Sequence, residues 1–188
     1  MQTVNVEGYT ILHLGCGVAK PPGHFGIDIN PRSHADLILD LDMTPWPLPD
    51  GHFEEVYCPA IIEHLRNFFR VFEEIHRVSK NGARVYISVP HYTDTAAFSD
   101  PTHVLHLNSF SFDILTQETL FSFYTKARFH VVSFQIVMLK LWKWIGIQWL
   151  VNSGFRCPWF QFIRKFWENY CCFIFRAKSM EIVIKVVK

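Results

Sequence analysis

The sequence lacks the features that mark several classes of protein. It contains no run of about 18 apolar residues, so we expect no membrane-spanning helix. Its first residues, MQTVNVEGY, include neither a basic region nor an apolar region, so we expect no signal peptide and a cytoplasmic location. The formal net charge is only +1, which leaves no overall field to attract nucleic acid. We therefore expect neither an integral membrane protein nor a nucleic-acid partner.

Cysteine is scarce, and its spacing is irregular. The odd number of cysteines fits no disulfide framework and no zinc-binding pattern: Cys16, Cys58, Cys157, Cys171 and Cys172. Asp100, His103 and His106 are a common enough combination to arise by chance, and we expect no metal there. Internal repeats and low-complexity tracts are also absent. With 49% hydrophobic and 19% charged residues, the chain is expected to form one globular domain, 1–188.

One stretch near the N-terminus has the order strand, glycine turn, strand and acid. Residues 9–14 are mostly apolar and predict a strand buried on both faces, and residues 25–29 predict a second strand. Between them, Gly15 and Gly17 allow a sharp turn and leave no side chain between the backbone and a ligand. Asp28 ends the second strand, where ligands bind in open parallel sheets. A carboxylate there can accept hydrogen bonds from both ribose hydroxyls, so the stretch predicts a nucleoside-containing cofactor.

The connection between these two strands is too short for a helix. Only seven residues, VAKPPGH, separate Gly17 from Phe25, whereas a parallel crossover usually takes about a dozen residues or more. Pro21-Pro22-Gly23 also prevents helix formation. We therefore expect a bare loop in place of the first crossover helix.

The rest of the chain predicts further strands and two helices. Apolar and β-branched residues predict strands at 35–41, 55–58, 84–90, 129–139 and 180–187. An amphipathic helix is predicted over 65–78, with Asn81-Gly82 ending it. A second helix is predicted from about residue 108 to 123.

The segment 141–178 differs from the rest by its aromatic and basic residues. It holds every tryptophan except Trp46, and its six basic residues against one acid give a net charge of 6 − 1 = +5. Its aromatic and aliphatic residues form a helical stripe: Trp159, Phe162, Ile163, Phe166, Trp167, Tyr170, Phe173 and Ile174. Three interpretations of this insert stay open. In the first, its helices close over the core or pair with a second subunit in a homodimer. In the second, they lie in the plane of a membrane surface. In the third, they form a lid over a lipid-linked or apolar acceptor.

The order of these motifs resembles a known family. The residues that carry the resemblance are GCG at 15–17, Asp28, Asp40, PLPDGHFEEVYC at 47–58, IIEHL at 61–65, RVSKNGARVYISVP at 77–90 and SDPTHVLHL at 99–107. Together they resemble the class I S-adenosylmethionine-dependent methyltransferases, and more narrowly the short type 11 methyltransferases found among bacterial surface-polysaccharide genes. The resemblance implies an α/β, Rossmann-like sheet of seven mainly parallel strands with the last one antiparallel. The first crossover helix would be missing, and the helical insert would lie between strands six and seven.

The resemblance also implies S-adenosylmethionine as the cofactor and a set of residues that bind it. Gly15 and Gly17 would approach its methionine part, and Asp28 would hold its ribose. Asp40, with Asp42 as a near alternative, would accept a hydrogen bond from the adenine amine. The implied cofactor-binding residues are Leu14, Gly15, Cys16, Gly17, Asp28, Ile29, Asp40, Leu41 and Pro59.

The implied reaction is methyl transfer to a small-molecule or glycan acceptor, including a lipid-linked one. Alignment of the two reactants supplies much of the acceleration, and a base is needed only if the acceptor must lose a proton. His103, His91 and Asp100 are the candidate catalytic residues. Glu63 and His64 have two interpretations. In one, Glu63 complements the N-terminal dipole of a helix and His64 packs locally; in the other, one of the two side chains faces the acceptor.

Two other functions stay open. His13 stands where the family often has an acid, and Ala19 replaces the third glycine of the loop. Both departures fit a degenerate methyltransferase-like scaffold that binds a membrane or a protein through its insert. A nicotinamide-dependent oxidoreductase also begins with a glycine turn, but Lys20 interrupts the G-x-G-x-x-G pattern. In dinucleotide-binding oxidoreductases the ribose-binding acid comes about 20 residues after the glycines, whereas in this sequence Asp28 follows Gly15 by only 13 residues.

Overall fold

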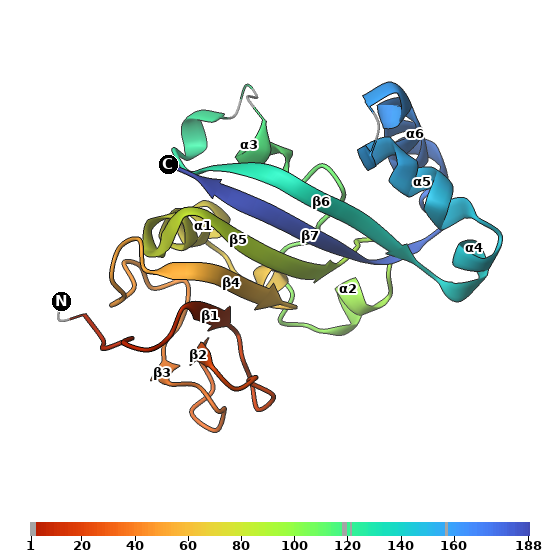
Figure 1. Ribbon diagram of the computed structural model, residues 1–188. Helices are drawn as coiled ribbons and strands as arrows, with labels where there is room; N and C mark the ends of the chain where they lie inside the picture. The colour runs from red at the N-terminus through yellow and green to blue at the C-terminus, as the bar shows by residue number, and fades with distance from the viewer. Residues whose placement is uncertain (1–2, 118–119, 121, 157) are drawn as a thin grey trace.

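The computed structural model describes residues 3–117, 120, 122–156 and 158–188. They form an α/β fold around a seven-stranded sheet of order β3-β2-β1-β4-β5-β7-β6 (Figure 1). The strands are β1 (Ile11–Leu14), β2 (His24–Asp28), β3 (Leu37–Ile38), β4 (Phe53–Pro59), β5 (Ser79–Pro90), β6 (Arg128–Met138) and β7 (Ala177–Val187). The pairs among β1 to β5 are parallel, and β7 runs antiparallel to both β5 and β6. The predicted fold class, with its antiparallel last strand, is confirmed.

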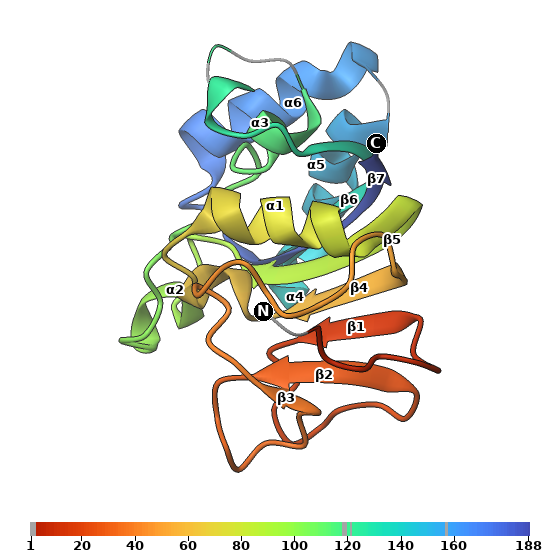
Figure 2. The same ribbon diagram turned by 90° about the vertical axis from the view of Figure 1, so that its left-hand side faces the viewer.

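Helices cover the two halves of the sheet unequally. The helices are α1 (Phe68–Val78), α2 (Ala96–Ser99), α3 (Asp113–Thr116), α4 (Lys140–Trp144), α5 (Ile147–Arg156) and α6 (Gln161–Phe166), with short 3-10 turns η1 (Ile62–His64), η2 (Ser122–Tyr124) and η3 (Pro158–Phe160) and a π-helix η4 (Trp167–Cys171). In Figure 2, α1 lies across β4 and β5, whereas β1, β2 and β3 are linked by loops. Residues 3–59 are all described and contain no helix, so the β1–β2 connection is a series of turns.

The predicted amphipathic helix is shorter than its sequence pattern. It begins at Phe68, because Leu65 is extended and the carboxylate of Asp42 accepts hydrogen bonds from the backbone N–H groups of Arg66 and Asn67. The prediction that Asn81-Gly82 ends it is wrong. The helix ends at Val78 and β5 starts at the next residue.

The strand β5 absorbs Asn81-Gly82 as a bulge. Phe53 pairs with Ser79 and Glu55 with Arg84, so one residue of β4 lies opposite four of β5. Gly82 has a φ of +83°, a conformation that favours glycine. The turn signal in the sequence is therefore used inside a strand rather than after a helix.

Other predicted elements differ in length. The strand expected over 35–41 pairs over only two residues, Leu37 with Ile27 and Ile38 with Asp28, at one edge of the sheet. The helix expected over 108–123 is the single turn α3 followed by η2, and residues 118, 119 and 121 lie outside the described residues.

The insert forms helices between β6 and β7, as expected. Figure 1 shows α4, α5 and α6 beyond the ends of these two strands. They pack around a small apolar cluster of their own: Ile136, Met138, Val151, Trp167, Cys172 and Ala177. The main core lies between the sheet and α1 and contains Phe53, Phe72 and Phe112, all almost fully buried. Because β1 to β5 run parallel, their carboxyl ends lie at the same edge of the sheet, and the loops that follow these strands are close together there.

Candidate cofactor and acceptor site

A cleft of about 470 Å³ lies at the carboxyl ends of the first strands. Five of the predicted cofactor-binding residues line it: Gly15, Asp28, Ile29, Asp40 and Leu41. They follow β1, β2 and β3, whose ends meet because these strands are parallel neighbours. The opposite wall comes from the loop after β4 and includes Ile61, His64 and Leu65. The volume is within the range of small-molecule sites.

The glycine turn is fixed by its backbone conformation and by a close neighbour. Gly15 has a φ of +63° and Gly17 a φ of +54°, which side chains rarely tolerate. The N–H of Gly15 donates to the carbonyl of Ile27 at 2.8 Å. A Cβ at Gly15 would lie 2.8 Å from the side chain of Ile61, so only glycine fits this wall of the cleft.

Asp28 organises the turn and retains capacity to bind a ligand. Its Oδ2 accepts a hydrogen bond from the N–H of Gly17 at 2.7 Å, and its Oδ1 accepts one from the N–H of Asn30 at 2.8 Å. Each carboxylate oxygen can accept a second hydrogen bond. The carboxylate lines the cleft with acceptor positions left for hydroxyl groups.

The two acids after β3 have different surroundings. The carboxylate of Asp42 is engaged by the backbone N–H groups of Arg66 and Asn67 at 2.9–3.1 Å, where it docks the loop on the start of α1. Asp40 is exposed, and its Oδ1 accepts one hydrogen bond, from the N–H of Asp42 at 2.9 Å. Asp40 thus keeps more free acceptor capacity toward the cleft.

Four predicted cofactor-binding residues do not line this cleft. Leu14 is fully buried in the core, and the side chain of Cys16 is buried beside Gly26 of β2. Gly17 acts through its hydrogen bond to Asp28. Pro59 lines a separate hollow with Tyr57 and Tyr86 on the face of the sheet away from α1. Residue type and order alone did not reveal on which side of the turn each of these side chains lies.

The loops after β4 and β5 meet beside the cleft. Glu63 and His64 of η1 lie next to His103, whose ring is in edge contact with that of His64 at 4.6 Å between centroids. The hydroxyl of Thr102 lies 2.9 Å from Nδ1 of His64 and donates to Oδ1 of Asp100 at 2.6 Å. Glu63 is 1% exposed, and burial raises the pKa of its carboxyl. Sequence reasoning did not single out Thr102, whose signal is its place between Asp100 and His103.

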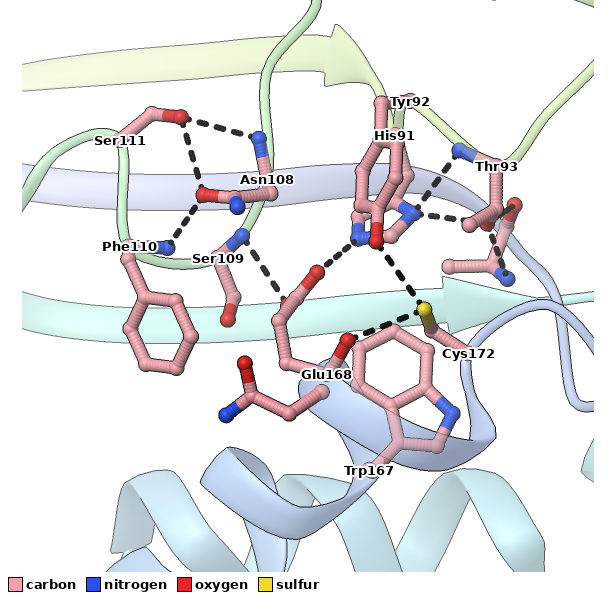
Figure 3. Close-up of polar contacts among 12 residues, drawn as sticks. His91, Tyr92, Thr93, Asn108, Ser109, Phe110, Ser111, Trp167, Glu168 and Cys172 are labelled. Atoms are coloured by element: carbon pink, nitrogen blue, oxygen red, sulfur yellow. Dashed lines mark hydrogen bonds and ion pairs between the residues drawn. The ribbon is translucent and has the colours of Figure 1, made fainter.

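The third catalytic candidate, His91, lies apart from this group. It is fully buried, its Nδ1 accepts from the N–H of Thr93, and its Nε2 lies 3.1 Å from Oε1 of Glu168 in the insert (Figure 3). Glu168 also accepts from the N–H of Ser109. The structure therefore brings His103 and Asp100 together but gives His91 a place in the contact between β5 and the insert.

Comparison with known proteins decides which cofactor such a cleft takes. Residues 12–87 match the family model of the type 11 methyltransferase domain, and this range contains the glycine turn, Asp28, Asp40 and His64. No curated protein sequence matches the chain. Residues 12–87 are therefore a methyltransferase domain, and this match supports a class I S-adenosylmethionine-dependent methyltransferase.

Solved structures share the fold of this methyltransferase at low sequence identity. A SAM-dependent methyltransferase from Archaeoglobus fulgidus has a TM-score of 0.60 at 17% identity, covering 95% of this chain and 86% of its own. The YcgJ protein of Bacillus subtilis has a TM-score of 0.55 at 13% identity, covering 97% and 94%. A Haemonchus contortus phosphoethanolamine N-methyltransferase 2, in complex with phosphomonomethylethanolamine and S-adenosylhomocysteine, has a TM-score of 0.53 at 14% identity, covering 100% and 50%.

The residues of the cleft fit this cofactor. The glycine turn leaves room for a ligand, and Asp28 and Asp40 keep unused acceptor positions toward the cleft. A nicotinamide-dependent oxidoreductase does not agree with the family, and that alternative is set aside.

Proposed function

We propose that this methyltransferase binds S-adenosylmethionine between its glycine turn, Asp28 and Asp40, and methylates a small-molecule or glycan acceptor that enters beside His64. The observation that carries the proposal is one cleft that has Gly15, Asp28 and Asp40 on one wall and His64 on the other. When bound, the cofactor supplies a methyl group activated by its positive sulfur.

In this proposal, one wall of the cleft binds the cofactor and the other wall binds the acceptor. Asp28 accepts hydrogen bonds from the ribose hydroxyls, and Asp40 accepts one from the adenine amine, while Ile29 and Leu41 contact the ring. On the acceptor side, His64 and His103 orient the group to be methylated. Asp100 is a positioning residue, because it reaches His64 through the hydroxyl of Thr102. Alignment of two reactants in this way can supply about 7–11 kcal/mol of the barrier.

Calorimetric titration with S-adenosylhomocysteine tests the cofactor half of the proposal. We expect micromolar binding by the wild type and binding weaker by about tenfold or more in Asp28→Ala, since a hydrogen bond to a charged group is worth about 1.5–3 kcal/mol. Asp40→Ala should also weaken binding. Glu7→Ala, an exposed acid remote from the cleft, is the matched control. No binding by a folded wild type would contradict the proposal and favour the degenerate scaffold.

We also propose that the insert contacts the surface of a membrane that carries the acceptor. Trp144 and Trp159 are 84% and 86% exposed. Further apolar side chains of the insert are exposed with them: Leu141, Ile145, Trp149, Leu150, Phe162, Phe166, Tyr170, Phe173 and Ile174. The insert's sole acid, Glu168, is buried, whereas its exposed lysines and arginine include Lys143, Lys165 and Arg176. Aromatic rings beside cations suit the boundary of an anionic bilayer. None of the helices in the described ranges has the length and hydropathy that a membrane crossing requires.

Co-sedimentation with vesicles tests this contact. We expect binding to phosphatidylcholine vesicles that contain phosphatidylglycerol, and its loss in the double variant Trp144→Ser, Trp159→Ser. Phe123→Ser, which removes an exposed ring outside the insert, should bind like the wild type. A dimer that the double variant dissociates, without vesicle binding by the wild type, would instead support subunit pairing through the insert.

A further inference from the structure

Three side chains of metal-binding type converge at the acceptor end of the cleft. One ligand atom from each of Glu63, His64 and His103 lies within 4.8 Å of the other two. Within the described ranges, no other three histidine, cysteine, aspartate or glutamate side chains come this close. The two loops are joined by backbone hydrogen bonds, because the carbonyl of Glu63 accepts from the N–H groups of Val104 and Leu105 at 2.9 and 3.0 Å. The backbone therefore fixes the position of the group.

Hydrogen bonds outside the group determine which histidine nitrogens are available. The hydroxyl proton of Thr102 goes to Asp100, so the Thr102 oxygen accepts from the Nδ1–H of His64. Nδ1 of His103 lies 3.2 Å from the carbonyl oxygen of Ala97, which can only accept, so this nitrogen also carries the proton. In both rings Nε2 is left with a lone pair. Outer hydrogen bonds of this kind orient histidine ligands in metal sites.

The third member of the group has an unsatisfied oxygen. Oε2 of Glu63 is buried and has no hydrogen-bond partner, and the whole residue is 1% exposed. A buried carboxylate oxygen without a partner is unfavourable unless a donor or a cation compensates it. One nitrogen of each ring converges with a carboxylate oxygen of Glu63, and Nε2 is the nitrogen that the hydrogen bonds leave free, so a cation bound by Glu63 and both rings would satisfy all three groups. Oδ2 of Asp100 lies 4.0 Å from Nε2 of His103 and adds negative charge beside such a cation.

We propose that Glu63, His64 and His103 bind one divalent transition-metal ion, with Zn²⁺ as the best match to two imidazoles and one carboxylate. Two histidines and a glutamate are a ligand set of catalytic zinc sites, and three protein ligands leave a position open for water or substrate. Around an ion with bonds of about 2.0–2.2 Å, ligand atoms lie about 3.4 Å apart, so the side chains move closer on binding.

The location suggests what the open position is for. His64 also lines the cofactor cleft, so the ion would lie beside the methyl donor. Resting on the proposed function, we infer that the ion coordinates the acceptor oxygen and favours its deprotonated form. The histidines would then act on the acceptor through the ion rather than as bases.

Metal titration of the full-length protein tests the site directly. After removal of metal with a chelator, we expect one equivalent of Zn²⁺ to bind, and Co²⁺ to give visible absorption bands of a nitrogen- and oxygen-bound site. Loss of a residue that only hydrogen-bonds to a metal ligand typically weakens metal binding by about 10–100-fold. Glu63→Gln and His103→Gln remove ligands themselves, so each should weaken Zn²⁺ binding by a larger factor. His106→Ala is the matched control, because its ring stacks on Phe98 outside the group. Circular dichroism checks that each variant is folded.

Either of two binding results would overturn the site, and so would one spectroscopic result. One is the absence of stoichiometric binding by the folded wild type, and the other is binding that the two ligand variants leave unchanged. Strong near-ultraviolet absorption with Co²⁺ would indicate cysteine thiolates and would overturn it as well. Titration of the chelator-treated protein with S-adenosylhomocysteine separates this failure from that of the proposed function. Retained cofactor binding without metal binding would contradict the metal site alone.

Discussion

Among the described residues, two histidine–glutamate clusters differ in whether the carboxylate oxygens of the glutamate have partners. Nε2 of His91 faces Oε1 of Glu168 at 3.1 Å, and the second oxygen of Glu168 accepts from Ser109 (Figure 3). In the other cluster the carboxyl of Glu63 has an unpartnered buried oxygen beside His64 and His103. Nε2 of His91 and both carboxylate oxygens of Glu168 have partners without a ligand, although the Ser109 hydroxyl beside them is buried without one, whereas in the second cluster the glutamate itself lacks a partner.

The difference follows from what each cluster connects. Glu168 comes from the insert and His91 is the residue directly after β5, so their contact attaches the insert to the sheet. Glu63 and His103 come from loops that border the cofactor cleft. A buried polar group with all its hydrogen bonds made stabilises the fold, whereas one left without partners needs an explanation, and at Glu63 the two converging histidines make a bound ion that explanation. The predictions below test this contrast.

The largest effect is expected from breaking the complete cluster. Glu168→Ala would leave two buried donors, the Nε2–H of His91 and the N–H of Ser109, without an acceptor. At about 1–3 kcal/mol for each unsatisfied group, the free energy of unfolding should fall by about 2–6 kcal/mol. Urea unfolding measures this. Glu168→Gln keeps an acceptor oxygen and should lose less. Equal stability of Glu168→Ala and wild type would contradict the structural role of this cluster.

A smaller effect is expected where the glycine turn meets the incomplete cluster. Gly15→Ala places a methyl group in a left-handed conformation, at about 1–2 kcal/mol, and against Ile61, the residue before η1. Gly23→Ala has the same kind of positive φ but no neighbour within 4 Å. Both variants should therefore lose stability, but only Gly15→Ala should lose S-adenosylhomocysteine affinity in calorimetry. Equal loss of affinity in both would contradict the close contact as its cause.

The strands and the turn that the sequence predicted depend on neighbouring residues, whereas the binding roles of Gly15, Gly17 and Asp28 stay predictions. The buried strand, the glycines and Asp28 lie within one short stretch, and parallel strands must bring their ends together, so this wall of the cleft follows from local pattern and sheet geometry. Local pattern also located the insert, because segment 141–178 lies between two stretches whose apolar and β-branched residues predict strands, and the helices α4, α5 and α6 lie between β6 and β7.

The features that it missed depend on residues far apart in the chain. Glu168 is separated from His91 by 77 residues, and nothing in either local sequence indicates their contact. Asp42 ends the amphipathic pattern early by binding the N–H groups of Arg66 and Asn67. The bulge at Gly82 depends on the register with β4. Tertiary partners thus decided where a helix started and which histidine was buried.

The pH dependence of stability should distinguish the two clusters further. Burial raises the pKa of Glu63 above its usual 4.5, so its protonated form contributes stability below pH 4.5 that is lost as pH rises through the folded pKa. Glu63→Gln removes this titration. In metal-free protein, the variant should therefore gain stability relative to wild type as the pH rises above 4.5. Urea unfolding across that range measures the difference. A constant difference would show that Glu63 does not titrate with a raised pKa.

The smallest effect on stability is expected at Thr102, because its side chain is exposed. Thr102→Val removes the acceptor for the Nδ1–H of His64, and the free energy of unfolding should change by less than about 1 kcal/mol. The substitution should instead change which ring nitrogen of His64 carries the proton. Long-range ¹H–¹⁵N spectra should show His64 protonated at Nδ1 in the wild type and a mixture of tautomers in Thr102→Val, while the tautomer of His91 stays unchanged. Because Thr102→Ser restores the hydroxyl, it should restore the single tautomer. A wild-type His64 protonated at Nε2 would remove the lone pair that the metal site requires, and would make this cluster as complete as the one at His91.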